Sequence, residues 1–170
     1  MAVEMELVGV RVQMPTNAPI LILRETDGQR RTVPIYIGGP EAHAIDLALS
    51  GTPTARPMTH DLLTTMIEGL GSTIEQIVVT ELRQGTFYAE LYVRDATGEV
   101  QTFSARPSDA VAIAVRAKVP ILAEEALIED AGIDEDEDED DRVDGVEEEE
   151  MVEELRRFLD EANPDDFKSS

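Results

Sequence analysis

The sequence predicts an α+β domain with a mostly antiparallel sheet and three helices, and three observations lead to this prediction. Short apolar runs rich in Val, Ile and Leu are separated by turn residues along most of residues 1–128. Three other segments repeat apolar residues at helical spacing, and each begins beside a proline. The order of three strands and then a helix occurs twice, in residues 5–50 and 74–117, which predicts an internal duplication of a βββα unit.

The first half is expected to form three strands and one helix. The helix runs from Pro40 to about Leu49 and ends at Ser50-Gly51. Gly9 falls inside the first expected strand, where it indicates a bulge. The strands are expected at 5–14, 20–23 and 32–37, with turns at 15–17 and 26–28.

The second half is reached through a linking helix that starts near Thr59 and ends at Gly69 to Gly71. The helix that begins at Pro107 is apolar nearly all round, so we expect it to be packed on more than one side. The linking helix carries apolar residues at helical spacing, namely Leu62, Leu63, Met66, Ile67 and Leu70. The strands are expected at 74–82, 86–94 and 99–105, with a short closing strand at 119–123.

Composition and length exclude several classes of protein. The chain has 170 residues, enough for one domain with a core and a modest appendage. It has no cysteine, which excludes a disulfide framework and thiolate metal sites and fits a reducing cytoplasm. The N-terminus lacks a basic region followed by an apolar run, and no apolar stretch approaches the roughly 18 residues of a membrane span. We therefore expect a soluble, cytoplasmic protein with no membrane contact.

The acidity of the chain is concentrated at its C-terminal end. Residues 1–128 hold 16 Asp and Glu against 10 Lys and Arg, whereas residues 129–170 hold 21 against 4 and carry −17 of the net charge of −23. We expect a folded domain over 1–128, an acidic disordered linker over 129–145, and an amphipathic helix with a short tail over 146–167. The apolar stripe of that last helix could dock on the domain, pair with a copy of itself or bind a partner.

Polar residues gather at the starts of the three expected helices. Such starts can be plain helix capping, since side-chain oxygens and negative charge suit the unpaired N–H groups of a first turn. They can also be three walls of one polar site. The segments concerned are Gly38-Gly39-Pro40-Glu41, Arg56-Pro57-Met58-Thr59-His60-Asp61 and Arg106-Pro107-Ser108-Asp109.

These segments belong to a longer set of motifs in a fixed order. The set consists of Pro34-Ile35-Tyr36-Ile37-Gly38, Glu41-Ala42, Ala44-Ile45, Arg56-Pro57-Met58-Thr59-His60-Asp61-Leu62, Ala105-Arg106-Pro107-Ser108-Asp109-Ala110 and Ala112-Ile113-Ala114. Over residues 5–128 their order and spacing resemble the bifunctional nuclease domain family. The resemblance implies an α+β domain that assembles into homo-oligomers and that cleaves DNA and RNA. The end of the chain, Asn163-Pro164-Asp165-Asp166-Phe167, looks like the tail of many bacterial members.

Hydrolysis of a phosphodiester bond needs an activated water, and the helix starts hold side chains suited to this. Glu41, Asp61 and Asp109 are carboxylates of the kind that bind Mg²⁺ or Mn²⁺, so these three are the expected metal ligands. His60, Asp61 and Asp109 are the expected catalytic residues, with His60 as general acid or base.

The same reaction needs stabilisation of charge on the phosphate. Arg56, Arg106 and Ser108 are the expected phosphate-binding residues, because a guanidinium forks onto phosphate oxygens and helix N-termini add N–H donors. The sequence has no His-Glu-x-x-His metal motif and no glycine-rich phosphate loop.

Each candidate also has a structural interpretation. Asp61 and Asp109 could only cap their helices, and Arg56 and Arg106 could pair with those aspartates and join the two halves of the domain. His43, in the first expected helix, fits a surface or interface position better than a functional one.

Two other classes of function compete with a nuclease. A nucleic-acid binder normally has a basic face, whereas the basic residues of 1–128 are scattered. A non-enzymatic oligomeric module whose acidic tail binds a basic protein explains the tail better. A small-anion or nucleotide binder could use the same helix starts without cleavage.

Overall fold

The computed structural model describes residues 1–134 of the chain. Within these residues the chain forms an α+β fold with a seven-stranded sheet and four helices. The strands are β1 (Ala2–Gln13), β2 (Ala18–Glu25), β3 (Thr32–Tyr36), β4 (Thr73–Arg83), β5 (Thr86–Arg94), β6 (Val100–Ala105) and β7 (Ile121–Glu124). The helices are α1 (Gly39–Leu49), α2 (Thr59–Gly69), α3 (Pro107–Ala117) and α4 (Glu125–Ala131).

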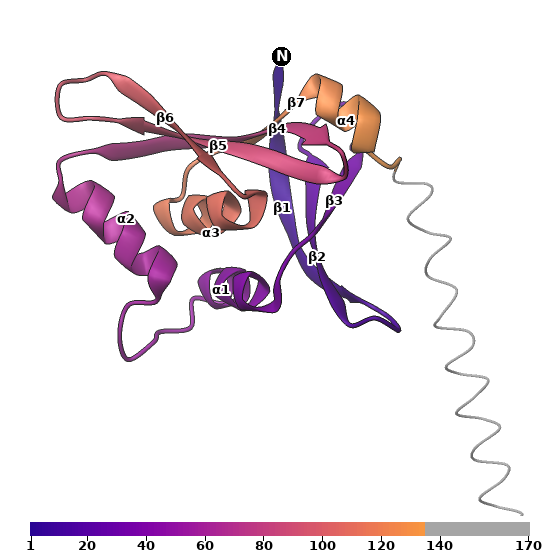
Figure 1. Cartoon of the computed structure of the whole chain (residues 1–170), viewed down its shortest axis with the longest axis horizontal. Helices are drawn as coiled ribbons and strands as arrows, with labels where there is room; N and C mark the ends of the chain where they lie inside the picture. The colour runs from indigo at the N-terminus through magenta and orange to yellow at the C-terminus, as the bar shows by residue number, and fades with distance from the viewer. Residues whose placement is uncertain (135–170) are drawn as a thin grey trace, which may run out of the picture. The chain divides into compact units, whose positions relative to one another are not determined.

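The sheet consists of two antiparallel meanders joined by the short strand β7. The strand order is β3-β2-β1-β7-β4-β5-β6, and only the contact between β7 and β4 is parallel (Figure 1). Each meander is the predicted run of three strands followed by a helix, α1 after β3 and α3 after β6. The duplication that the sequence suggested stays a prediction.

The bulge expected in the first strand is present. Leu7 pairs with Leu23 and Gly9 pairs with Ile22, so one extra residue is accommodated in β1 at this point. Gly9 has φ 144°, a backbone conformation that side chains with a Cβ rarely adopt. The glycine therefore allows β1 to change register without breaking its pairing with β2.

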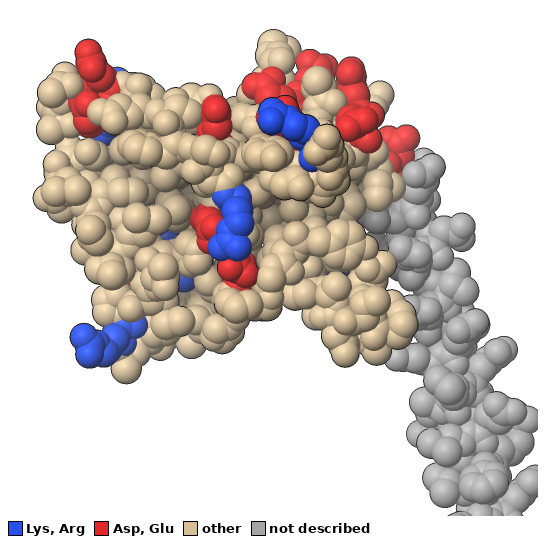
Figure 2. Space-filling model, in the orientation of Figure 1, with Lys and Arg blue, Asp and Glu red and all other residues tan. Residues whose placement is uncertain are grey.

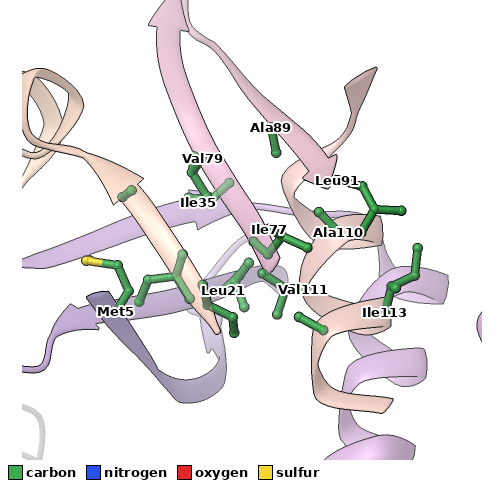
Figure 3. Close-up of a cluster of buried hydrophobic side chains, with 14 of the residues drawn as sticks. Met5, Leu21, Ile35, Ile77, Val79, Ala89, Leu91, Ala110, Val111 and Ile113 are labelled. Carbon is green, nitrogen blue, oxygen red and sulfur yellow. The ribbon is translucent and has the colours of Figure 1, made fainter. Parts of the chain in front are cut away.

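Helix α3 is the centre of the core, as its apolar sequence predicted. It packs against α1, α2, β4 and β5, and its segment Ala110–Ala114 is buried. Figure 3 shows side chains of α3 meeting those of the central strands, with Val111 beside Ile77 and Leu21. Because α3 is fixed by neighbours on several sides, the residues at its start are held in one place relative to α1 and α2.

The prediction of three helices was wrong, because α4 adds a fourth. This helix has seven residues, too few for a helical period to stand out from the acidic residues around it. It is nevertheless anchored: Ile128 is fully buried, and Ile133 forms two backbone hydrogen bonds with Thr32 of β3, both 2.8 Å long. The described unit therefore extends into the segment expected to be a disordered linker. The rest of that linker, and the expected C-terminal helix, lie outside the described residues.

Helix α2 has the predicted span, but much of its apolar stripe is exposed. Leu62, Leu63, Met66 and Leu70 are between 40% and 76% exposed, whereas Thr64 is buried. At about 100° per residue, the centre of the exposed stripe lies roughly 145° around the helix from Thr64. Among the described residues, no helix combines the length and the apolar character that crossing a membrane requires.

Candidate functional site

The starts of α1, α2 and α3 lie together, as one interpretation of the sequence predicted. Pro40 and Pro107 occupy the first turns of α1 and α3, where a missing N–H costs nothing, so each helix begins soon after the strand before it. Because α3 packs against both α1 and α2, its first turn meets residues of both helices. We call Glu41, His60, Arg106 and Asp109 the helix-start cluster.

Asp109 is at the centre of the helix-start cluster. Its Oδ1 lies 2.9 Å from Nε2 of His60 on α2, and its Oδ2 accepts a hydrogen bond of 2.7 Å from Nε of Arg106. Burial alone would raise the pKa of Asp109, but the hydrogen bonds from Arg106 and His60 outweigh it and leave this pKa below its usual 3.8. Asp109 is therefore ionised at neutral pH.

The ionised state of Asp109 determines the tautomer of His60. A carboxylate only accepts hydrogen bonds, so the contact requires a hydrogen on Nε2 of His60. In the neutral imidazole this leaves Nδ1 as the nitrogen that can accept a proton. The His60 side chain is 12% exposed, and its backbone oxygen accepts a 2.8 Å hydrogen bond from Thr64 one turn later.

Arg106 joins Asp109 to α1. Its Nη2 donates a 2.9 Å hydrogen bond to Oε1 of Glu41, while its Nε is bound to Asp109. The hydrogen bonds to Asp109 and Glu41 raise the pKa of Arg106 above its already high value. The Arg106 side chain is 66% exposed, so it is the member of the cluster most accessible to a ligand. Figure 2 shows basic and acidic side chains touching over α1 and α3, near the middle of this face.

Asp61 is bound to an arginine that the sequence analysis did not select. Its Oδ1 accepts a 2.5 Å hydrogen bond from Nε of Arg116, and its Oδ2 accepts one of 2.9 Å from the backbone N–H of Met58. The same guanidinium donates to the backbone oxygens of Ala44 on α1 and Ala112 on α3. Arg116 lowers the pKa of Asp61, helped by the Met58 N–H.

Arg116 thus connects α1, α2 and α3, and its side chain is only 9% exposed. The sequence contains a feature from which the role of Arg116 could have been predicted. Arg116 is the one charged residue in the otherwise apolar run after Asp109, and it lies seven residues, or about two helical turns, further on. It therefore lies on the same face of α3 as Asp109, beside the first turn of α2.

Two of the expected phosphate-binding residues are not part of the cluster. Arg56 is exposed in the loop between α1 and α2, and its side chain has no hydrogen-bond or ion-pair partner within residues 1–134. A separate basic side chain stands out from that loop in Figure 2. Ser108 is buried in the first turn of α3, where it offers little surface to a phosphate. His43 is exposed on α1.

The expected pairing of arginines with aspartates therefore occurs with a different partner in one case. Arg106 pairs with Asp109, as the structural interpretation proposed. Asp61 pairs with Arg116 and not with Arg56, and it also caps α2 through the Met58 N–H. The pair of Asp61 and Arg116 connects α2 with α3, whereas Arg106 and Asp109 lie three residues apart at the start of α3.

The three expected metal ligands do not form a metal-binding group in this arrangement. Glu41 and Asp109 are bridged by the Arg106 guanidinium, and the two oxygens of Asp61 are taken by Arg116 and Met58. In the part of the chain that the structure describes, no group of three or more His, Asp or Glu side chains could hold a metal ion. In this arrangement each of the three carboxylates is bound to an arginine side chain.

The chain is similar to proteins of one named family. The family model described as the bifunctional nuclease domain matches residues 21–136. An uncharacterized protein of Mycobacterium tuberculosis is 44% identical over 167 residues, which cover 98% of this chain and 99% of that protein. The bifunctional nuclease 2 proteins of Oryza sativa subsp. japonica and Arabidopsis thaliana are 33% and 30% identical over 128 and 118 residues. These two matches cover 74% and 67% of this chain but only 39% and 36% of the plant proteins.

Proposed function

Because the chain belongs to the bifunctional nuclease domain family, we propose that it hydrolyses phosphodiester bonds of DNA or RNA at the helix-start cluster. One observation carries this assignment to the cluster. An ionised carboxylate, Asp109, holds the imidazole of His60 through one oxygen and the exposed guanidinium of Arg106 through the other. A proton acceptor and a phosphate-binding cation are thus fixed by the same side chain.

In this proposal His60 is the general base. Water attacks phosphorus, and the proton that it loses passes to Nδ1 of His60 while the P–O bond to the leaving oxygen breaks. The leaving oxygen takes a proton from solvent, which gives one hydroxyl end and one phosphate monoester end. Asp109 keeps Nε2 protonated and stabilises the imidazolium that forms, which is the role of a carboxylate beside a catalytic histidine.

Arg106 would bind the phosphate oxygens and stabilise the additional negative charge that develops on them. Its guanidinium already binds Glu41 and Asp109, so an incoming phosphate must compete with these two carboxylates. This competition predicts a low affinity for nucleic acid, and this affinity should fall further as salt is added. Arg56, which has no side-chain partner among the described residues, would add a second contact to the nucleic-acid backbone.

Asp61 takes a positioning role in this proposal. It neighbours His60 in α2, and Arg116 and the Met58 N–H hold it in place. The requirement for Mg²⁺ or Mn²⁺ stays a prediction, since the three expected ligands are each bound to an arginine here.

The test is cleavage of single-stranded DNA and of RNA by the purified full chain, compared with matched variants. His60→Gln is compared with His43→Gln, because His43 is the other histidine of the chain and is exposed. Arg106→Ala is compared with Arg83→Ala, an arginine of similar exposure that pairs with Glu81 and lies on β4. We expect the two cluster variants to lose at least about 100-fold in rate and the two controls to stay within about twofold.

Circular dichroism of every variant checks that it is folded. Parallel reactions with EDTA, and with added Mg²⁺ or Mn²⁺, test the metal prediction independently of the residue assignment. Cleavage that survives in folded His60→Gln and Arg106→Ala proteins would contradict the assignment of the site. Absence of cleavage by the unchanged chain under all metal conditions would contradict the proposed activity.

A second candidate is a non-enzymatic oligomeric module. The observation that favours it is that Arg106 and Arg116 already satisfy Glu41, Asp61 and Asp109, as expected of a structural joint between helices. In this case the acidic C-terminal segment would bind a basic protein, and deletion of residues 135–170 would abolish that binding. The same cleavage assay separates the two candidates, since a module without activity shows none in any variant.

A further inference from the structure

Phe103 is an exposed aromatic residue that lies just before the helix-start cluster in the chain. Of the five Phe and Tyr residues in 1–134, only Tyr36 and Phe103 are exposed. Tyr36 ends β3 at one edge of the sheet, whereas Phe103 lies in β6 at the opposite edge and is 49% exposed. A ring in such a position offers a flat apolar face to a planar ligand.

The ring of Phe103 lies on the side of the sheet that α3 covers. Phe103 pairs with Leu91 of β5, and the side chains of two residues paired in this way point to the same face. Leu91 is buried in the core cluster that also contains Ala110 of α3 (Figure 3). Arg106 and Asp109 of the helix-start cluster lie at the start of α3, so the ring and the cluster share one side of the sheet.

Arg106 follows Phe103 at a short distance. Three residues separate the two, so at about 3.3 Å per residue their Cα atoms lie about 10 Å apart. The side chain of Arg106 is also exposed. The neighbours of the ring on this face of β5 and β6 are all uncharged, namely Ala89, Leu91, Val93, Gln101 and Ala105. A ligand can therefore reach the ring without meeting a carboxylate of these two strands.

We propose that the ring of Phe103 stacks on a base of a single-stranded nucleic acid while Arg106 binds a phosphate of the same strand. This inference rests on the proposed function and deepens it by naming the form of the substrate. Stacking of a base on an aromatic ring is a general way in which proteins hold single strands. Because every base has a π-face, this contact does not depend on which base is present.

Stacking on Phe103 selects single strands over duplexes. In a duplex each base already stacks on its neighbours, and unstacking it costs free energy. Stacking also supplies binding that does not depend on charge. Residues 1–134 hold 19 acidic residues against 10 basic ones, so attraction between charges alone holds a polyanion weakly.

The chain has no tryptophan, so Phe103→Trp places a single fluorescent indole at the proposed contact. The probe is a short oligothymidylate added to the full chain in EDTA, and gel electrophoresis checks that the DNA stays intact. A base that stacks on the indole quenches its emission, so we expect a saturable loss of fluorescence. Tyr36→Trp is the matched control, because Tyr36 is exposed on the opposite edge strand, and the emission of this variant should not change.

Two further probes separate stacking from phosphate binding. Inorganic polyphosphate carries phosphates without bases, so it should leave the emission of the Phe103→Trp protein unchanged. A DNA duplex of the same length should quench this emission much less than the single strand, because its bases are stacked on one another. Equal quenching by all three probes would mean that the indole responds to any polyanion, and this result would contradict stacking.

Phe103→Leu tests the natural ring through the affinity for the same oligothymidylate, measured by fluorescence anisotropy. Loss of the ring should raise Kd at least about fivefold, whereas Phe103→Tyr, which keeps a ring, should stay within about twofold of the unchanged chain. Arg106→Ala should weaken the binding of both DNA and polyphosphate. Phe103→Leu should weaken only the binding of DNA, and this difference separates lost stacking from a defect in folding.

None of these measurements needs cleavage. Emission of a folded Phe103→Trp protein that stays unchanged on adding DNA would overturn the proposal, as would a folded Phe103→Leu protein that binds DNA as tightly as the unchanged chain. Quenching in a chain that cleaves nothing would support the stacking contact and contradict only the proposed hydrolysis. Cleavage without quenching would overturn only the stacking contact.

Discussion

At the scale of single residues, the site is organised by carboxylates that each bind two partners. Asp109 joins His60 and Arg106, and Asp61 joins Arg116 and the Met58 N–H. Each contact crosses from one helix to another or fixes a first turn. The lowered pKa values of both aspartates follow from these contacts, so they connect the geometry to measurable behaviour in solution.

The pH dependence of stability tests the contact between Asp61 and Arg116. Because the pKa of Asp61 is below its usual 3.8 in the folded state, its contribution to the free energy of unfolding is fully present above about pH 5. The contribution is lost as the pH falls below 3.8 through the folded pKa. Urea unfolding should therefore show a stability difference between the unchanged chain and Asp61→Asn at pH 7 that shrinks at pH 3. A difference that is constant with pH would mean that Asp61 is not held as an anion.

Removal of Arg116 should be costly, since its side chain is nearly buried and donates to three acceptors on three helices. We expect Arg116→Met to lower the free energy of unfolding by about 2–4 kcal/mol, because Asp61 and two backbone oxygens lose a charged donor. Arg94→Met is the control, because Arg94 on β5 also binds an acid but is far more exposed, and it should cost about 1 kcal/mol or less. Equal losses for both, measured by urea unfolding, would contradict a structural role specific to Arg116.

At the scale of elements, most of the fold follows from local patterns. The alternating and apolar runs, the turns and the proline-led helix starts lie within a few residues of their observed bounds, because these signals depend on neighbouring residues. The sequence pattern did not predict helix α4, because its seven residues are shorter than two helical turns and are surrounded by acidic residues. It packs against β3 and β4, which lie far away in the sequence.

A pair of substitutions tests how differently the apolar side chains of α4 and α2 are buried. Ile128 of α4 is fully buried, so Ile128→Ala should lower the free energy of unfolding by about 2–5 kcal/mol through lost contacts and a cavity. Leu62 of α2 is exposed, so Leu62→Ala should change stability by about 0.5 kcal/mol or less. Thermal or urea unfolding measures both. A reversed order would mean that the apolar stripe of α2 is covered in solution and that α4 is not anchored.

At the scale of the whole molecule, charge is divided very unevenly along the chain. Residues 135–170 hold 18 acidic residues against 4 basic ones, a net charge of −14, whereas residues 1–134 carry −9. The basic side chains that would contact nucleic acid all lie in residues 1–134 and include the exposed Arg56 and Arg106. The C-terminal segment therefore opposes the approach of any polyanion through long-range repulsion.

Deletion of residues 135–170 should strengthen the binding of a short single-stranded DNA, because −14 of charge is removed and no basic residue near the helix-start cluster is lost. The gain should be largest at low salt and should shrink as added salt screens the repulsion. Fluorescence anisotropy at 20 mM and 200 mM salt measures both forms. Weaker binding by the shortened chain would mean that the segment contributes contacts that outweigh its charge.

The sequence by itself determined the α+β class, the order of strands and helices, and the polar residues at the helix starts, because these depend on short stretches of chain. Only the tertiary structure decided which charges pair. Arg116 reached Asp61 in place of Arg56, and Arg106, which pairs with Asp109 three residues further on, also reached Glu41 of α1, because α3 packs against both α1 and α2. It also decided that the stripe of α2 is exposed and that β6 is an edge strand of the sheet formed by residues 1–134. Pairing and exposure depend on which segments meet across the sheet, and no local pattern contains that information.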